Sequence, residues 1–289
     1  MQVHKATGEA LAQLRAESQN PKTDIWWGGT GDPYLQAAEV GLLDAYRPAY
    51  LNDLRGWAVR QYAMSENHVG GFYTSVIGFG WNEDLRRKKK LPAPKCRADL
   101  TDPKYQGEVK TSKPGSSGTG YTILAGLVQL MGEGAAFDDL QRLHRNVTQY
   151  TRSGQAQAKS VAKGEVGTGV SFVFGFESER QQGFTMVRSA APCEGTSYQI
   201  GGLALVKGSR SREAARRYAD WLMSPAGQSI GAKANSLQVP ANKTFKPDAR
   251  TPSIESVRLV KYDFQKYGRA AERKRLIERW EKEVNSLPR

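Results

Sequence analysis

The residues best suited to chemistry lie in a small, hydroxyl-rich loop, 114–120, with the sequence PGSSGTG. Ser116, Ser117 and Thr119 carry hydroxyl donors, and glycines such as Gly118 let a ligand approach the backbone closely. The apolar residues that follow recur at helical spacing, so the loop should lead into the first turn of a helix. Free backbone N–H groups and the positive end of the helix dipole make such a turn suitable for binding an anion.

This loop does not match the nucleotide-binding motifs. No lysine follows its glycines to reach the outer phosphates of a nucleotide, so it is not a Walker A loop. It also lacks the glycine spacing of a dinucleotide fingerprint. An ordinary serine or threonine N-cap uses the same residue types, so a purely structural role remains open.

Two more turns could carry the same chemistry. Thr7 is a candidate N-cap for a helix that should end near residue 18, and residues 2–4 before it suggest the end of a strand. Gly29 and Thr30 lie in a glycine-rich turn between an apolar segment and another helix. This alternation predicts a parallel α/β sheet, in which ligands bind at the carboxyl ends of strands. We therefore expect all three turns to face one crevice.

Other side chains are candidates for the remaining contacts to a ligand. Arg152 and Ser153, at another expected helix start, could add donors for an anion, although Arg152 also fits a solvated surface cation. Glu194 and Tyr198 could bind hydroxyl groups or an amine on an organic ligand. The alternatives are a salt bridge for Glu194 and packing for Tyr198. Glu177 could contact the ligand or be an ordinary surface charge.

Composition limits the possible classes of protein. The 289 residues are 39% hydrophobic, enough for two lobes with cores of their own, and no apolar run approaches the roughly 20 residues that span a bilayer. The net charge of +13 comes partly from basic clusters at 86–90, 207–217 and 269–279. The last cluster alternates with glutamates, which indicates a solvated helix face with i,i+4 ion pairs. Because zinc-finger spacing and an RNA-binding aromatic motif are both missing, we expect no nucleic-acid partner.

The sequence does not favour an enzyme. The one G-x-S-x-G match, GQSIG at 227–231, falls inside a helix expected to start at Pro225 and is therefore not a nucleophile elbow, and the three histidines have no evident catalytic partners. A phosphate-ester hydrolase remains an alternative, but we expect no catalytic residues, no metal site and no cofactor. In an exported protein, Cys96 and Cys193 are candidates for one disulfide; two unrelated buried thiols are the other interpretation.

Further segments predict the organisation of the chain. A β-rich stretch at 70–81 should be followed by a proline-stiffened connector at 91–95, where we expect a crossing between lobes. The return crossing is expected near 191–198. We also predict a strand at 166–176 and closing helices at 254–264 and 269–284.

Several of these segments, in their order along the chain, match a known family. They are TDIWWGGTGDP, GFGWN, LTDPKYQGEVKTSKPGSSGTGYT, SVAKGEVGTGVSF, CEGTSYQIGGLALVKGS and YADWLMSPAGQ. Together they resemble the periplasmic solute-binding proteins of ABC importers. More narrowly, they are similar to the branch labelled ferric-iron binding, which also holds sugar-phosphate and aminoethylphosphonate binders.

The resemblance implies the type II periplasmic-binding-protein fold, with two twisted α/β sheets joined by two crossing segments. Lobe 1 would contain residues 1–94 and 193–289, and lobe 2 residues 95–192. A ligand would bind between the lobes, and the closed protein, generally a monomer in this family, would deliver it to a membrane permease. Cys96 and Cys193 would both lie beside the crossings, which favours a disulfide.

The resemblance also implies a periplasmic location, although the chain has no signal peptide to read. It begins at Met1 in what corresponds to the second strand of the family. We therefore expect the first strand–helix unit of lobe 1 to be absent.

The ligand expected from the sequence is a small anion. Ferric-iron binders of this branch commonly hold the metal with adjacent tyrosines in the second lobe, but segment 171–177 reads SFVFGFE and no tyrosine pair occurs in the chain. We therefore predict an organic solute that bears a phosphate or phosphonate. Ferric-iron transport is the alternative.

Overall fold

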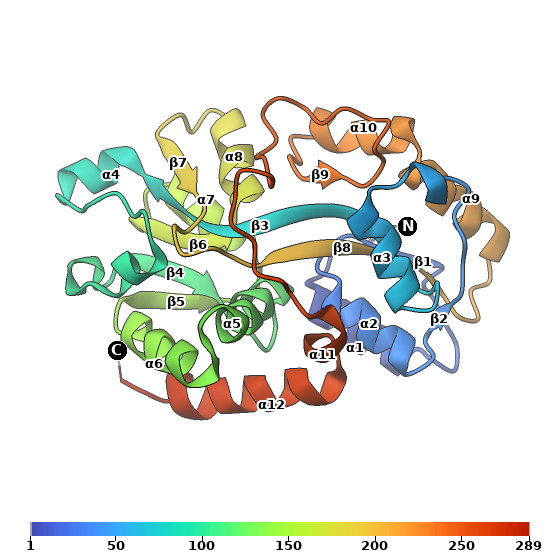
Figure 1. The fold of residues 1–289 in the computed structure, drawn as a ribbon, viewed down its shortest axis with the longest axis horizontal. Helices are drawn as coiled ribbons and strands as arrows, with labels where there is room; N and C mark the ends of the chain where they lie inside the picture. The colour runs from blue at the N-terminus through green and yellow to red at the C-terminus, as the bar shows by residue number, and fades with distance from the viewer. Residues whose placement is uncertain (1, 289) are drawn as a thin grey trace. The chain divides into compact units, whose positions relative to one another are not determined.

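The computed structural model describes residues 2–288 and divides them into two compact units. Unit 1 contains the residues up to Thr74, together with Gln199–Thr251 and Asp263–Ala270. Unit 2 contains Ser75–Tyr198, Pro252–Tyr262 and the residues from Ala271 onward. Each unit contains strands and helices of its own (Figure 1).

This division differs from the predicted lobes. The chain passes between the units after residues 74, 198, 251, 262 and 270, five times rather than the expected two. The connector at 91–95 lies inside unit 2, because the first passage is made by the long strand β3 (Gly70–Asn82). A continuous strand has no break in composition, so the sequence gives no sign that the chain changes unit there.

Unit 1 is built around antiparallel strand pairs. β1 and β2 both pair with β8, and β9 pairs with the first part of β3, each antiparallel. The prediction of a parallel sheet is therefore wrong for these pairs. The elements are β1 (Ile25–Trp27), β2 (Leu43–Asp44), β8 (Tyr198–Val206), β9 (Val239–Pro240), α1 (Thr7–Ala16), α2 (Asp32–Glu39), η1 (Leu51–Asp53), α3 (Gly56–Met64), α9 (Arg212–Met223), α10 (Pro225–Lys233) and α11 (Phe264–Tyr267).

The core of unit 1 explains how its glycine-rich turn is held. Leu11 and Leu14, three residues apart on α1, are buried with Trp26 of β1. Trp26 stacks on Tyr34 of α2, with the ring centroids 3.6 Å apart. This packing fixes β1 against α2 and therefore fixes the turn between them. The strand predicted at residues 2–4 does not form; Val3 is 58% exposed, so burial does not favour one.

Unit 2 contains the parallel sheet that the sequence predicts. β4 (Val109–Ser112) lies between β5 (Val147–Thr151) and β6 (Thr168–Phe172) and is parallel to both. The second part of β3 pairs antiparallel with β6 and with β7 (Val187–Ala190). The helices are α4 (Glu83–Lys88), η2 (Arg97–Thr101), η3 (Pro103–Tyr105), α5 (Gly118–Met131), α6 (Glu133–His144), α7 (Ala156–Ala162), α8 (Val173–Gln181), α12 (Ala270–Trp280) and the short π-helix η4 (Glu281–Asn285).

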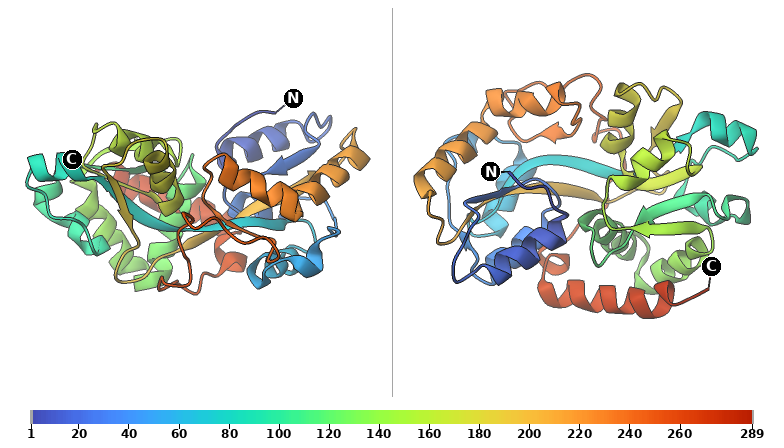
Figure 2. Two further views of the ribbon diagram at one scale, coloured as in Figure 1. Left: turned by 90° about the horizontal axis from the view of Figure 1, so that it is seen from above. Right: turned by 180° about the vertical axis from the view of Figure 1, so that it is seen from behind.

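The C-terminal helix α12 lies beside α6 in unit 2 (Figure 1), and the right view of Figure 2 shows this from behind. Arg279 of α12 lies over the ring of Phe137 at 4.1 Å, and Gln141 donates a hydrogen bond to the carbonyl of Glu283 at 3.1 Å. The helix predicted at 269–284 is therefore confirmed, and its packing on unit 2 is set by these contacts.

Two other expected elements differ from the structure, one in its bounds and one in its presence. The strand predicted at 166–176 ends at Phe172, where α8 begins. Both segments are buried, and a fully buried helix start cannot be separated from a strand by periodicity. The helix predicted at 254–264 is absent apart from the start of α11, and most of that segment is exposed, although its apolar residues recur at helical spacing.

A disulfide joins Cys96 and Cys193 in unit 2, with 4.7 Å between the Cα atoms. The backbone N–H of Cys193 also donates to the carbonyl of Lys95 at 3.0 Å. The bond therefore ties the segment before η2 to the segment after β7, the pairing that the family resemblance favoured. Among the described residues, no helix is long and apolar enough to cross a membrane.

Candidate functional site

Three parallel strands of unit 2 end at one edge of the sheet. Because β5, β4 and β6 run in the same direction, their carboxyl ends meet there. β4 is followed by loop 113–117 and α5, β5 by loop 152–155 and α7, and β6 directly by α8. This edge, which we call the strand edge, therefore brings together the hydroxyl-rich loop and the loop that holds Arg152 and Ser153.

The N-terminus of α5 supplies donors at the strand edge. Ser117 is the N-cap, and its hydroxyl accepts a hydrogen bond from the N–H of Gly120 at 3.3 Å. Helix geometry leaves the N–H groups of Gly118 and Thr119 without an intrahelical acceptor. The Ser116 hydroxyl is buried and has no hydrogen-bond partner among the described residues. The Ser117 hydroxyl therefore has the N-cap role that the sequence left open. The donors that remain for a ligand come from Ser116, Gly118 and Thr119.

Loop 152–155 is in direct contact with the first turn of α5. A Cβ atom at Gly154 would lie 1.9 Å from the Thr119 hydroxyl, so only glycine fits without movement. Ser171, at the end of β6, donates a hydrogen bond to the carbonyl of Gly154 at 2.5 Å. Neither Gly154 nor Ser171 was a candidate from the sequence, because their importance depends on contacts between neighbouring strands. These contacts fix Thr119 in place.

Arg152 and Ser153 lie exposed in loop 152–155. The Ser153 hydroxyl accepts from the N–H of Gln155 at 3.3 Å, and its carbonyl accepts from the Thr151 hydroxyl at 2.8 Å. The structure therefore places both predicted residues at the strand edge, with Arg152 as an exposed cation.

The predicted carboxylates and Tyr198 already have local partners. Glu177, in the second turn of α8, forms an ion pair with Arg180 at 2.7 Å. The carboxylate of Glu194 accepts backbone N–H bonds from Arg97 and the next residue, at 2.9 and 3.1 Å, and so caps η2. Tyr198 packs edge-on against another tyrosine ring. None of these contacts involves the strand edge, and a role for these residues in ligand binding stays a prediction.

The three candidates in unit 1 lie together. Thr30 donates its backbone N–H to the Thr7 hydroxyl at 3.3 Å, and the Thr30 hydroxyl is buried without a partner among the described residues. Gly29 has a positive φ of 74°, and a Cβ there would lie 2.3 Å from the Thr7 hydroxyl, so the turn requires glycine. Ala6, not Thr7, is the N-cap of α1, because the Thr7 hydroxyl accepts from the glycine-rich turn instead.

Tyr73 of β3 also holds this turn and was not a candidate from the sequence. Its hydroxyl accepts from the N–H of Gly29 at 2.6 Å and donates to the carbonyl of the same residue at 3.2 Å. Burial raises the pKa of Tyr73 to about 12, so the phenol stays neutral and can do both. The Gly29 N–H is therefore already bonded to Tyr73.

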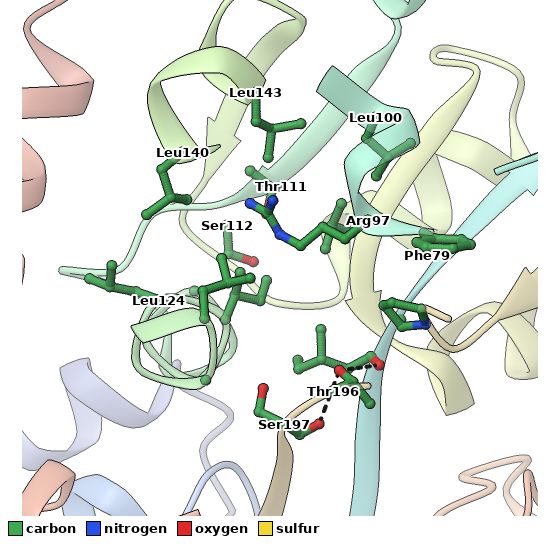
Figure 3. Close-up of a pocket in the computed structure, with 18 of the residues that line it drawn as sticks. Phe79, Arg97, Leu100, Thr111, Ser112, Leu124, Leu140, Leu143, Thr196 and Ser197 are labelled. Carbon is green, nitrogen blue, oxygen red and sulfur yellow. Dashed lines mark hydrogen bonds between the residues drawn. The ribbon is translucent and has the colours of Figure 1, made fainter. Parts of the chain in front are cut away.

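A small cavity of about 40 Å³ in unit 2 lies under α5 (Figure 3). Most of the side chains around it are apolar, among them Phe79, Leu124 and Leu140. The guanidinium of Arg97 reaches into it near Thr111 and forms an ion pair with Asp139 of α6. Burial lowers the pKa of Arg97 to about 10, which still leaves it protonated at neutral pH.

This cavity is not a site for an organic solute. Its volume of about 40 Å³ holds one or a few water molecules, since one water molecule needs about 10–15 Å³ of cavity volume. One group of cysteine and carboxylate side chains in the described part of the chain is close enough to share a metal ion: Cys96, Cys193 and Glu194. Both sulfurs are in the disulfide, so this group offers no thiolate.

Comparisons with known proteins place the chain in a family. Residues 21–266 match the family model described as bacterial extracellular solute-binding protein. An uncharacterized protein of Haemophilus influenzae is 40% identical over 98% of this chain and 82% of its own length. The phosphoglycerate transport regulatory protein PgtC of Salmonella typhimurium is 25% identical over 71% of this chain, which spans about half (51%) of that relative.

Solved structures show the same fold. The periplasmic binding protein AfuA from Actinobacillus pleuropneumoniae, with exogenous fructose-6-phosphate bound, is 36% identical and has a TM-score of 0.93 over 99% of this chain and 90% of its own. The periplasmic binding protein P5PA is 32% identical, with a TM-score of 0.92 over 98% and 90%. Iron-bound HitA from Pseudomonas aeruginosa is 21% identical, with a TM-score of 0.76 over 94% and 87%, and shows the fold alone.

The predicted type II periplasmic-binding-protein fold is confirmed by these structures. The family and these structures are binding proteins. Membership of a solute-binding family implies two partners, a small-molecule ligand and a membrane permease. The chain belongs to the bacterial extracellular solute-binding proteins, the solute-capturing components of ABC importers.

Proposed function

We propose that this protein captures a small organic solute bearing a phosphate or phosphonate, and that the strand edge of unit 2 binds the anionic group. The observation that carries the proposal is the donor set at the start of α5. It combines the hydroxyls of Ser116 and Thr119 with the N–H groups of Gly118 and Thr119. An anion accepts hydrogen bonds from all of these, whereas a cation cannot.

The charges near the loops favour the same choice. Loops 113–117 and 152–155 contain no aspartate or glutamate, but they contain Arg152, an exposed cation, and Lys113, which is paired with Glu281 of the C-terminal segment. The α5 dipole places about half a positive charge at the helix N-terminus. Ferric iron would require anionic oxygen ligands, which neither loop supplies. The electrostatics of the strand edge therefore support a phosphate more than a metal ion.

Two relatives support the same class of ligand. AfuA was solved with fructose-6-phosphate, and PgtC is named for phosphoglycerate transport. Neither identifies the solute of this chain. The similarity to HitA, below 25% identity, supports the fold and gives no support to iron.

A thermal-shift panel tests the proposal. It contains fructose 6-phosphate, fructose, inorganic phosphate, 2-aminoethylphosphonate, citrate and ferric citrate. A phosphorylated ligand at 100 times its Kd should stabilise the protein by about 2.7 kcal/mol, while fructose should have no effect. Stabilisation by ferric citrate but not citrate would instead support the iron alternative. Release of inorganic phosphate from the ester would support the hydrolase alternative.

A matched pair of variants locates the bound group. Thr119→Val removes one hydroxyl from the strand edge with little change in volume. Since a hydrogen bond to a charged group contributes about 1.5–3 kcal/mol, the Kd for fructose 6-phosphate should rise about tenfold to a hundredfold in calorimetry. Thr148→Val, at the opposite end of β5, should leave the Kd unchanged. Equal Kd values for the two variants would contradict the assignment to α5.

A further inference from the structure

A buried arginine from the C-terminal helix contacts the loop that precedes α5. Arg273 of α12 is 7% exposed, and its Nη2 atom donates a hydrogen bond to the carbonyl of Pro114 at 3.3 Å. Its guanidinium also lies over the ring of Tyr121, 4.3 Å from the centroid. Pro114 lies before the N-cap of α5 and Tyr121 lies in its first turn. One side chain therefore contacts the chain on both sides of the N-cap.

Two further contacts join the same C-terminal segment to loop 113–117. Lys113 forms an ion pair with Glu281 at 2.9 Å. A Cβ at Gly115 would lie 3.6 Å from a methyl carbon of Ile277, so the backbone there packs against the side chain. Figure 1 shows α12 passing below α5 and α6 in unit 2. The loop is thus supported along its length by residues more than 150 positions later in the sequence.

The chemistry of Arg273 suits support of an anion site. Its positive charge is buried next to the positive end of the α5 dipole, where water screens it less than at the surface. The hydrogen bond to Pro114 orients a carbonyl two residues before the Ser116 hydroxyl. A basic residue in this cluster was expected on a solvated helix face; Arg273 instead faces inward, because it stacks on Tyr121.

We propose that Arg273 is a positioning residue of the anion site: it holds loop 113–117 through the Pro114 carbonyl and adds positive charge behind the loop, so that affinity for a phosphate group depends on it without direct contact. The inference rests on the proposed function, because it concerns the same strand edge.

Three variants test this role. Arg273→Met removes the charge and the hydrogen bond but keeps much of the apolar side chain, and Arg273→Lys keeps the charge. The matched control is Arg279→Met. Arg279 lies on the same helix, over the Phe137 ring at 4.1 Å and in ion pairs with Glu133 and Glu283, and none of these three partners belongs to loop 113–117. Arg279→Met therefore removes one positive charge and one contact with an aromatic ring elsewhere in unit 2.

Two measurements are made on each variant of the full chain. Calorimetry with fructose 6-phosphate should show a Kd about tenfold higher for Arg273→Met, within about threefold of wild type for Arg273→Lys, and unchanged for Arg279→Met, where tenfold is about 1.4 kcal/mol. Hydrogen exchange without ligand should be faster for the amides of residues 115–121 in Arg273→Met only. A general loss of stability should appear in both Arg273→Met and Arg279→Met. The difference in Kd between these two variants therefore reports the effect of Arg273 on the loop.

The outcomes separate the two proposals. If wild type binds fructose 6-phosphate and Arg273→Met binds it equally well, the positioning role is overturned. If wild type binds no phosphorylated compound of the panel, the proposed function fails. The hydrogen-exchange rates of residues 115–121 then show whether Arg273 orders the loop. Unchanged exchange in Arg273→Met overturns the inference whatever the ligand.

Discussion

Gly154 is the residue whose substitution tests the geometry of the strand edge most directly. An added Cβ would lie 1.9 Å from the Thr119 hydroxyl and 2.7 Å from the Thr119 Cβ. Real Cβ atoms essentially never approach other heavy atoms within 3.0 Å, so the carbon and the hydroxyl must separate by about 1.1 Å in Gly154→Ala. Rotating the hydroxyl away leaves the second contact in place. The backbone of loop 152–155 or of α5 must therefore move.

The expected effects follow from that displacement. Overpacking at a buried contact costs about 1–3 kcal/mol, so the free energy of unfolding measured in urea should fall by that amount. Because a displacement of about 1 Å in a positioned group can cost a factor of a hundred, the Kd for fructose 6-phosphate should rise at least about tenfold. Calorimetry measures this on the same protein.

The control is Gly134→Ala in the exposed first turn of α6, where an added Cβ meets nothing within 4 Å. Alanine there should raise the free energy of unfolding by up to about 1 kcal/mol and leave the Kd unchanged. If Gly154→Ala matches wild type in stability and affinity, the contact between Gly154 and Thr119 is not as described. If it loses stability but keeps its affinity, Thr119 is not part of the anion site.

Three further changes test the rest of unit 2. Replacing Cys96 and Cys193 by serine opens a crosslink across 97 positions and should lower the free energy of unfolding by about 4–5 kcal/mol in urea; an unchanged midpoint would contradict this. Hydrogen bonds from Arg275 hold the pKa of Glu133 at about 2, below its usual 4.5, so this carboxylate stabilises the fold above pH 4.5 and loses that effect as the pH falls toward 2. Melting temperatures of Glu133→Gln should therefore fall less steeply than wild type over that range, and parallel curves would refute the ion pair. Asn82→Ala removes the side chain that caps α4 at 3.0 Å and should cost about 1 kcal/mol in urea, whereas a loss near zero would show that the cap is unimportant.

Local features of the structure were largely predictable from the sequence. The hydroxyl-rich loop leads into α5 with Ser117 as its N-cap, because the residues that favour a cap stand just before an apolar helical repeat. β3 also lies where the β-rich stretch at 70–81 places it. In these cases the decisive interactions join residues a few positions apart.

Long-range features were not predictable in the same way. The chain leaves unit 1 within β3, where the sequence shows no break, rather than at the prolines of 91–95. β1 and β8 are antiparallel, although the local alternation of strand and helix suggested a parallel sheet. Strand direction depends on which segments pair, and a single sequence does not display those partners. The disulfide was suggested by family resemblance for the same reason.

The candidate site shows why donors are easier to find than the groups that position them. Ser116 and Thr119 stand out because hydroxyls and glycines cluster in one loop. Gly154, Ser171 and Arg273 gain their roles from contacts with that loop across the fold. The donors themselves are neutral, so the attraction for an anion must come from the α5 dipole and from nearby cations. Substitutions that move the loop, or that remove Arg273, should therefore weaken phosphate binding although they leave every proposed donor in the chain.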